Sequence, residues 1–118
     1  MKYLCLIYNE EKRLETIPPQ AVEAIAAECV DFDAALAKDG KFVACDRLQP
    51  TRTAATVRFR DGKATVTDGP FAETKEQLAG FYLIEAADRD EAIRLAAKIP
   101  PARLGCVEVR PVWGYGKP

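Results

Sequence analysis

The stretch Asp68-Gly69-Pro70-Phe71-Ala72-Glu73-Thr74-Lys75-Glu76 lies between two segments with the composition of strands, residues 65–67 and 80–86. In a structural interpretation, Asp68 accepts backbone N–H bonds across a turn, Gly69 supplies an unusual φ angle and Phe71 anchors the loop in the core. In a functional interpretation, Asp68 stands at the lip of a cleft as a carboxylate base or a ligand contact. Glu73 and Lys75 then lie beside it as opposite charges.

The segment before this stretch has the pattern of a β-hairpin. Residues 53–60 alternate apolar and polar side chains, which is the period of a half-buried strand. Asp61-Gly62 is a typical two-residue hairpin turn. Residues 63–67 return with Ala64 and Val66 on the apolar face. The sequence therefore predicts two paired strands directly before the acidic turn.

Two amphipathic helices are predicted further out. Pro18 or Pro19 suits the first turn of a helix, and Gly40 suits its C-terminal cap. Between them, one apolar stripe follows helical spacing through Val22, Ile25, Cys29, Phe32 and Leu36. The second helix begins after Asp88, with Glu91 three residues on as in a capping box. Its apolar stripe is Ala92, Leu95, Ala96 and Ile99, and Pro100-Pro101 ends it.

Four further segments have the composition of strands: residues 2–8, 42–48, 81–84 and 106–112, with a polar loop over residues 9–15. The resulting order is strand, helix, strand, hairpin, strand, helix, strand. We therefore predict one domain over residues 1–118, of the α+β class. It has a ferredoxin-like plan, with two helices on one face of a mostly antiparallel sheet and an inserted hairpin. The other sheet face then needs a cover, and a second copy of the same sheet is the simplest one.

Composition excludes several classes of function. Seventeen basic residues balance eighteen acidic ones, so neither nucleic acid nor a membrane surface is an expected partner. No apolar run approaches the ~20 residues that span a bilayer. Histidine is absent, which removes the usual general base and the commonest metal ligand. The four cysteines are widely spaced, which indicates reduced thiols in a cytoplasmic protein. We expect no metal and no cofactor.

A family resemblance rests on segments that occur in order along nearly the whole chain. They are residues 1–8 (MKYLCLIY), 48–50 (LQP), 56–58 (TVR), 66–78 (VTDGPFAETKEQL), 80–82 (GFY) and 107–112 (VEVRPV). Together they resemble the DGPF branch of the YCII-related family of bacterial proteins. The Asp-Gly-Pro-Phe-Ala-Glu block is the most specific part of the match.

The resemblance implies a dimeric α+β barrel, in which two ferredoxin-like sheets meet face to face around a central cleft. It also implies a possible regulatory or ligand-sensing role, because branch members often occur beside genes for extracytoplasmic-function sigma factors. Shorter members of the wider family carry a His–Asp pair proposed as an active site. This chain has no histidine, so that pair cannot be carried over, and Asp68 is the residue that matches the branch motif.

The residues singled out for a cleft come from three segments: Asp46 and Arg47 of the second strand, Asp68, Phe71, Glu73 and Lys75 of the acidic stretch, and Tyr82 of the following strand. Asp46-Arg47 is also typical of an ordinary pair at a strand end. Tyr82 is equally typical of a core residue with a satisfied hydroxyl.

Three functions stay open on the sequence alone. The first is a regulator or sensor that binds a small ligand and contacts a protein partner. The second is a cofactor-independent enzyme that uses Asp68 as an acid or base on a small organic molecule. The third is a structural dimer with a filled interior. A wet pocket lined by Asp68, Tyr82 and an arginine favours the enzyme, an apolar pocket favours ligand sensing, and no pocket favours the structural dimer.

Overall fold

The computed structural model of the chain describes residues 1–115 and is built on one four-stranded sheet. All neighbouring strands are antiparallel, in the order β2-β5-β1-β6. The strands are β1 (Lys2–Asn9), β2 (Phe42–Arg47), β5 (Gln77–Glu85) and β6 (Gly105–Pro111). The predicted α+β class and antiparallel sheet are confirmed, and the topology is compatible with the ferredoxin-like plan.

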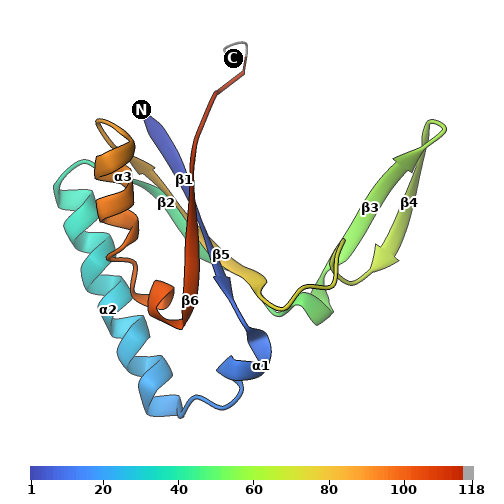
Figure 1. The fold of residues 1–118 in the computed structure, drawn as a ribbon, viewed down its shortest axis with the longest axis horizontal. Helices are drawn as coiled ribbons and strands as arrows, with labels where there is room; N and C mark the ends of the chain where they lie inside the picture. Colours follow the sequence, from blue (N-terminus) through green and yellow to red (C-terminus); the bar gives the residue numbers. More distant parts are fainter. Residues whose placement is uncertain (116–118) are drawn as a thin grey trace.

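Two helices, α2 (Pro19–Lys38) and α3 (Arg89–Ala96), lie side by side along one face of this sheet (Figure 1). The core sits between them and the sheet. Alternate residues of β1 and β5 enter it, because side chains of a strand point to opposite faces in turn. The fully buried core residues include Cys5 of β1, Ile84 of β5 and Ile99, which follows α3.

The ends of both helices follow the predicted capping chemistry. Pro19 occupies the first helical position of α2, and Gly40 follows its C-terminus with a φ of 72°. At α3, the Asp88 carboxylate accepts a hydrogen bond from the Glu91 backbone N–H at 2.9 Å. The predicted starts and ends of both helices are therefore confirmed to within a few residues.

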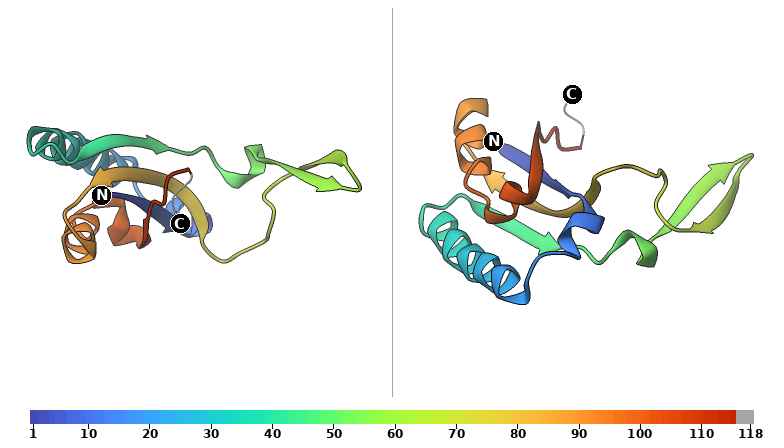
Figure 2. Two further views of the ribbon diagram at one scale, coloured as in Figure 1. Left: turned by 90° about the horizontal axis from the view of Figure 1, so that it is seen from above. Right: turned by 60° about the horizontal axis from the view of Figure 1, so that its bottom comes forward.

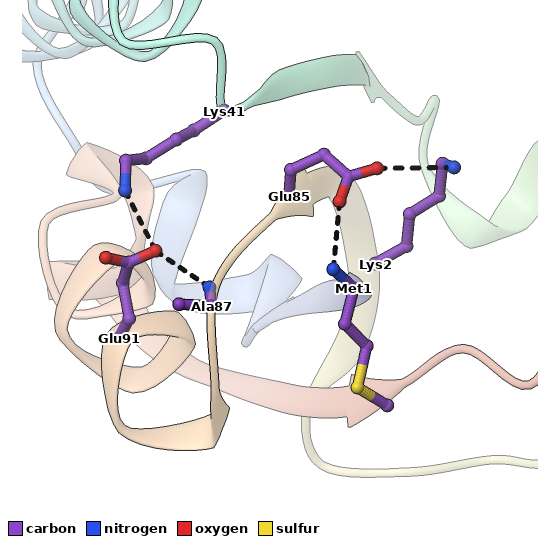
Figure 3. A network of polar contacts seen from close by, with 6 residues as sticks. All are labelled: Met1, Lys2, Lys41, Glu85, Ala87 and Glu91. Carbon is purple, nitrogen blue, oxygen red and sulfur yellow. Dashed lines mark hydrogen bonds and ion pairs between the residues drawn. The ribbon is translucent and has the colours of Figure 1, made fainter.

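A polar network joins the ends of these elements at the surface (Figure 3). The Glu85 carboxylate contacts the amino group of Met1 at 3.1 Å and the ammonium group of Lys2 at 3.3 Å. The Glu91 carboxylate pairs with Lys41 at 2.8 Å and accepts the Ala87 backbone N–H at 3.0 Å. The second pair connects the loop after α2 to the first turn of α3.

We expect the Lys41–Glu91 contact to make stability depend on acid pH. The hydrogen bond from Lys41, followed by that from Ala87, lowers the pKa of Glu91. A carboxylate whose folded-state pKa is lowered stabilises the fold above its unfolded pKa of about 4.3, and this contribution is lost as pH falls through the folded-state value. The Glu91→Gln variant should therefore have a lower melting temperature than wild type near neutral pH. This difference in melting temperature should vanish in acid. A difference that persists unchanged in acid would contradict this assignment.

The predicted hairpin forms a separate two-stranded sheet, β3 (Ala55–Arg60) and β4 (Lys63–Asp68), which we call the arm. Its turn residues Asp61 and Gly62 have φ angles of 51° and 77°, as the Asp-Gly signal predicts. The arm projects away from the helices and the sheet (Figures 1 and 2). Its apolar face is uncovered, with Phe59 78% exposed and Val66 68% exposed. The prediction of half-buried strands is therefore wrong for the single chain.

The sheet face opposite the helices is also uncovered. The register places Leu4 opposite Leu83 and Leu6 opposite Phe81, and all four side chains are only partly buried. We call this surface the open face. It carries charge at its margins, because Glu108 stands opposite Leu6 and forms an ion pair with Arg110.

The loop predicted over residues 9–15 contains a short helix, α1 (Glu11–Leu14). Tertiary contacts hold it. The Glu11 backbone N–H donates to the Gln77 side chain at 2.9 Å, and the Glu11 carboxylate accepts from the backbone and hydroxyl of Thr51 at 2.8 and 2.9 Å. Two 3₁₀ turns complete the fold, η1 (Thr51–Thr53) and η2 (Pro100–Leu104). Within residues 1–115, no helix is long and apolar enough to cross a membrane.

Candidate functional site

A cavity of about 490 Å³ lies between the N-terminal half of α2 and the sheet, and we call it the α2 pocket. This volume is within the range of about 300–1,000 Å³ typical of small-molecule sites. Most of its wall is aliphatic, including Ile7 of β1, Leu14 of α1, Ile17, Val22 and Ile25 of α2 and its lead-in, and Leu104 of η2.

The burial of α2 is not uniform along its length. The predicted apolar stripe faces the sheet, but its burial falls toward the N-terminal end. Leu36, near the C-terminus, is 3% exposed, whereas Val22, near the N-terminus, is 38% exposed. The apolar side chains at the open end therefore line a cavity instead of filling a core.

The polar part of the pocket wall is a cluster around Asp33 of α2. The Tyr82 hydroxyl donates to Asp33 Oδ1 at 2.5 Å, and the Cys45 thiol donates to Asp33 Oδ2 at 3.6 Å. The Tyr82 ring is held edge-on to Phe32, with ring centroids 5.5 Å apart. Three elements, α2, β2 and β5, thus bring Asp33, Cys45 and Tyr82 together, and we call these residues the Asp33 cluster.

The environment keeps the donors of this cluster protonated. Burial, followed by the hydrogen bond and charge of Asp33, raises the pKa of Tyr82 well above its ordinary value. Burial and then the charge of Asp33 raise the pKa of Cys45 to about 11. The same two causes, in the same order, raise the pKa of Cys29, which also lines the pocket. Neither thiol is therefore an activated nucleophile at neutral pH, because the thiolate is the reactive form.

Three of the seven residues predicted for a cleft line the α2 pocket: Tyr82, Asp46 and Arg47. Tyr82 is buried with a satisfied hydroxyl, as its core interpretation predicts. Its side chain lies on the helix side of the sheet and borders the α2 pocket, so it does not line the cleft expected between two sheets. Asp46 stands opposite Phe81 in the register, next to the open face, and both Asp46 and Arg47 are exposed.

The other four predicted residues, Asp68, Phe71, Glu73 and Lys75, lie at the base of the arm and in the loop after it, outside the lining of the pocket. Phe71 is 79% exposed, so its expected role as a core anchor is wrong for the single chain. An aromatic residue cannot anchor this loop in the core when the loop runs outside the four-stranded sheet, as Figure 1 shows.

The acidic turn is held by contacts other than the predicted one. Gly69 has a φ of 98°, as expected, and its N–H donates to the Ala54 carbonyl at 2.7 Å. The Thr56 hydroxyl donates to the Gly69 carbonyl at 2.8 Å. Within the described residues, no hydrogen bond reaches the carboxylate of Asp68. The prediction that Asp68 accepts backbone N–H bonds across the turn is therefore wrong.

The position of Asp33 in the sequence is itself a signal of its role. Asp33 lies four residues after Cys29 and three before Leu36, and so falls on the apolar stripe of α2. A carboxylate on the buried face of an amphipathic helix needs a hydrogen-bonding partner. The identity of that partner, Tyr82, depends on the tertiary fold because the two residues are 49 positions apart.

We expect Tyr82→Phe to destabilise the protein more than Asp68→Ala. The first change leaves Asp33 Oδ1 without its donor, which costs ~1 kcal/mol or more. The second removes an exposed carboxylate without a hydrogen bond, which typically changes stability by less than about 0.5 kcal/mol. Urea unfolding of the two variants and of wild type measures both effects. A larger loss for Asp68→Ala would restore the original turn assignment.

A second cavity and a metal centre were the other candidate sites within the described residues, and neither has a polar cluster like that of the α2 pocket. A cavity of about 410 Å³ between α3 and β6 has Arg89 as its single charged lining residue and no polar cluster. Among residues 1–115, no group of three histidine, cysteine, aspartate or glutamate side chains is placed to hold a metal ion.

Comparison with known proteins gives one family match and one uncharacterised relative. The sequence model of the YCII-related domain matches residues 1–115. An uncharacterised protein of Rhizobium meliloti (strain 1021) is 40% identical over 117 residues, which cover 98% of this chain and 94% of that protein.

Proposed function

The chain belongs to the YCII-related family, and from that premise we propose that it is a small-ligand-binding protein whose site is the α2 pocket. The observation that carries this proposal is the combination of an aliphatic cavity with the Asp33 cluster in its wall. Small-molecule sites typically have this composition, in which apolar walls supply affinity and a few placed polar groups supply orientation.

Ligand sensing is favoured over catalysis by the chemistry of the cluster. Tyr82 and Cys45 keep their protons at neutral pH, so neither is a general base or a nucleophile there. Asp68, the acid or base of the enzymatic alternative, is exposed at the base of the arm and outside the pocket. A ligand-sensing regulator, the role implied by the resemblance to the DGPF branch, needs a pocket but no catalytic set.

We further propose that the protein acts as a homodimer in the cytoplasm. Two uncovered apolar surfaces support the dimer: the open face, with Leu6 and Phe81, and the arm, with Phe59 and Val66. Exposed apolar patches larger than a few hundred Å² are rare on monomers. The four free cysteines are typical of a reducing compartment.

The test of the pocket uses methyl NMR of isoleucine-labelled protein. Of the six isoleucines, Ile7, Ile17 and Ile25 line the α2 pocket, whereas Ile84, Ile93 and Ile99 lie elsewhere. In a screen of small amphipathic molecules, we expect binders to shift the first three methyl signals and to leave the other three in place.

A matched pair of α2 variants controls this test. Both Ala26 and its neighbour Ala27 are exposed, but only Ala26 lines the pocket. Ala26→Phe should abolish the shifts by filling the cavity, and Ala27→Phe should preserve them. A screen without any binder, or binders that act equally on all six methyl groups, would contradict the proposed function.

A further inference from the structure

The Asp33 cluster presents hydrogen-bond acceptors to the pocket. The Tyr82 proton is committed to Asp33 Oδ1, and the Cys45 proton to Asp33 Oδ2. A carboxylate offers about four acceptor positions, of which two are used here. The remaining positions, and the lone pairs of the Tyr82 oxygen, are left for a donor. A ligand that meets this cluster therefore needs N–H or O–H groups at one end.

The charge of the cluster is negative and has no cationic partner within the described residues. The ion pairs found among residues 1–115 all lie at other carboxylates. Of the other charged lining residues, Glu11 is occupied by Thr51, and Asp46 and Arg47 are exposed opposite charges on β2. The influence of Asp33 on both neighbouring thiols is consistent with this local negative potential.

A half-buried carboxylate in an aliphatic cavity attracts a cation more strongly than it would in water. Charge-assisted hydrogen bonds are shorter and stronger than neutral ones, and a buried charge is costly unless it is paired. An ammonium group carries three donors and no acceptor, which matches a site that offers acceptors only. A ligand carboxylate, by contrast, meets a like charge in Asp33.

We propose that the α2 pocket selects a small organic amine, bound through its ammonium group to Asp33 and through an apolar body to the aliphatic wall. This inference rests on the proposed function and adds the chemical class of the ligand. The aliphatic residues Ile7, Ile17 and Ile25 contact the body, and the Tyr82 oxygen accepts a second hydrogen bond from the head.

The experiment compares three probes with one apolar body and different heads: 4-phenylbutylamine, 4-phenylbutan-1-ol and 5-phenylpentanoate. Dissociation constants are measured at neutral pH from the methyl signals of Ile7, Ile17 and Ile25. We expect the amine to bind at least about tenfold more tightly than the alcohol, the factor that a charged hydrogen bond typically contributes, and the carboxylate to bind most weakly.

Two variants with the same chemical change separate Asp33 from its surroundings. Asp33→Asn should raise the dissociation constant of the amine by about tenfold or more. It should change the dissociation constant of the alcohol by no more than about threefold. Asp46→Asn makes the same change at an exposed carboxylate of the pocket lining and should change the affinity for neither probe by more than about threefold. Unchanged signals of Ile84 and Ile99 show that the fold is intact. If Asp33→Asn fails to fold, the comparison of the three probes on the wild-type protein still tests whether the pocket selects an amine.

The outcomes distinguish this inference from the proposed function. Equal binding of all three probes, or tightest binding of the carboxylate, overturns the amine class and leaves the pocket as a ligand site. Failure of the amine to move any pocket methyl also overturns the amine class. The proposed function falls with it only if the broader screen of small molecules gives no binder either.

Discussion

Phe59→Asp is expected to convert the proposed homodimer into a monomer. Phe59 is 78% exposed on the apolar face of the arm, where it stands opposite Ala64 and in line with Val57 and Val66. A central aromatic residue of an interface typically contributes about 2 kcal/mol or more, and a buried carboxylate adds a desolvation cost. The dimer dissociation constant should therefore rise by at least about 30-fold.

Sedimentation equilibrium measures this change. Thr67→Asp provides a matched control, because it places the same charge on the opposite face of the arm, where Thr67 pairs with Thr56. The control should remain a dimer. A wild-type protein that is monomeric at micromolar concentration, or a Phe59→Asp variant that dimerises as strongly as wild type, would contradict the role assigned to the arm.

Gly105→Ala is expected to cause a large loss of stability, because the added methyl group has no space. Gly105 begins β6 and lies against the end of β1, opposite Asn9. A Cβ atom at this position would lie 1.9 Å from the Tyr8 carbonyl oxygen and 2.9 Å from Asn9 Nδ2. The first neighbour is backbone of a central strand, so relief requires the two strands to separate locally.

The cost should exceed that of ordinary overpacking and reach on the order of 3 kcal/mol. Thermal unfolding should show a fall in melting temperature of roughly 10–20 °C. Cys106→Ala, at the next, exposed position of β6, should stay within about 0.5 kcal/mol of wild type. A Gly105→Ala variant as stable as wild type would show that β1 and β6 are not packed this closely.

The arrangement of the main sheet and helices could be predicted because each signal is local. The apolar run of β1, the stripe of α2 and the Asp88–Glu91 cap each specify one element with little help from the rest of the chain. The two-residue turn Asp61-Gly62 likewise determines its own hairpin. These signals together give the order of the six strands and of α2 and α3, although not the short helix α1.

The position of the arm could not be predicted in the same way. Alternation of Val57 and Phe59 with polar residues shows that one face is apolar, but it does not say what covers that face. The same pattern suits a strand packed on its own core and a strand that meets a second copy. Phe71 was misassigned for the same reason, because an apolar residue in a loop does not reveal which surface it contacts.

The candidate site was predicted only in part. Tyr82 was identified as a polar group in a core strand, but Asp33 became visible only when the fold brought α2 onto β5. The α2 pocket lies where the burial of the apolar stripe of α2 decreases, from Leu36 at 3% exposed to Val22 at 38% exposed. No local pattern encodes this pocket, because residues of α1 and η2 also form its wall.

The most direct test of the account is a crystal structure of the wild-type protein with the tightest binder found in the methyl screen. We predict continuous ligand density between α2 and β5, with a donor of the ligand within hydrogen-bonding distance of Asp33 and the apolar part against Ile7 and Ile25. Density on the open face or beside the arm, with α2 closed onto the sheet and no space left at Asp33, would contradict the account.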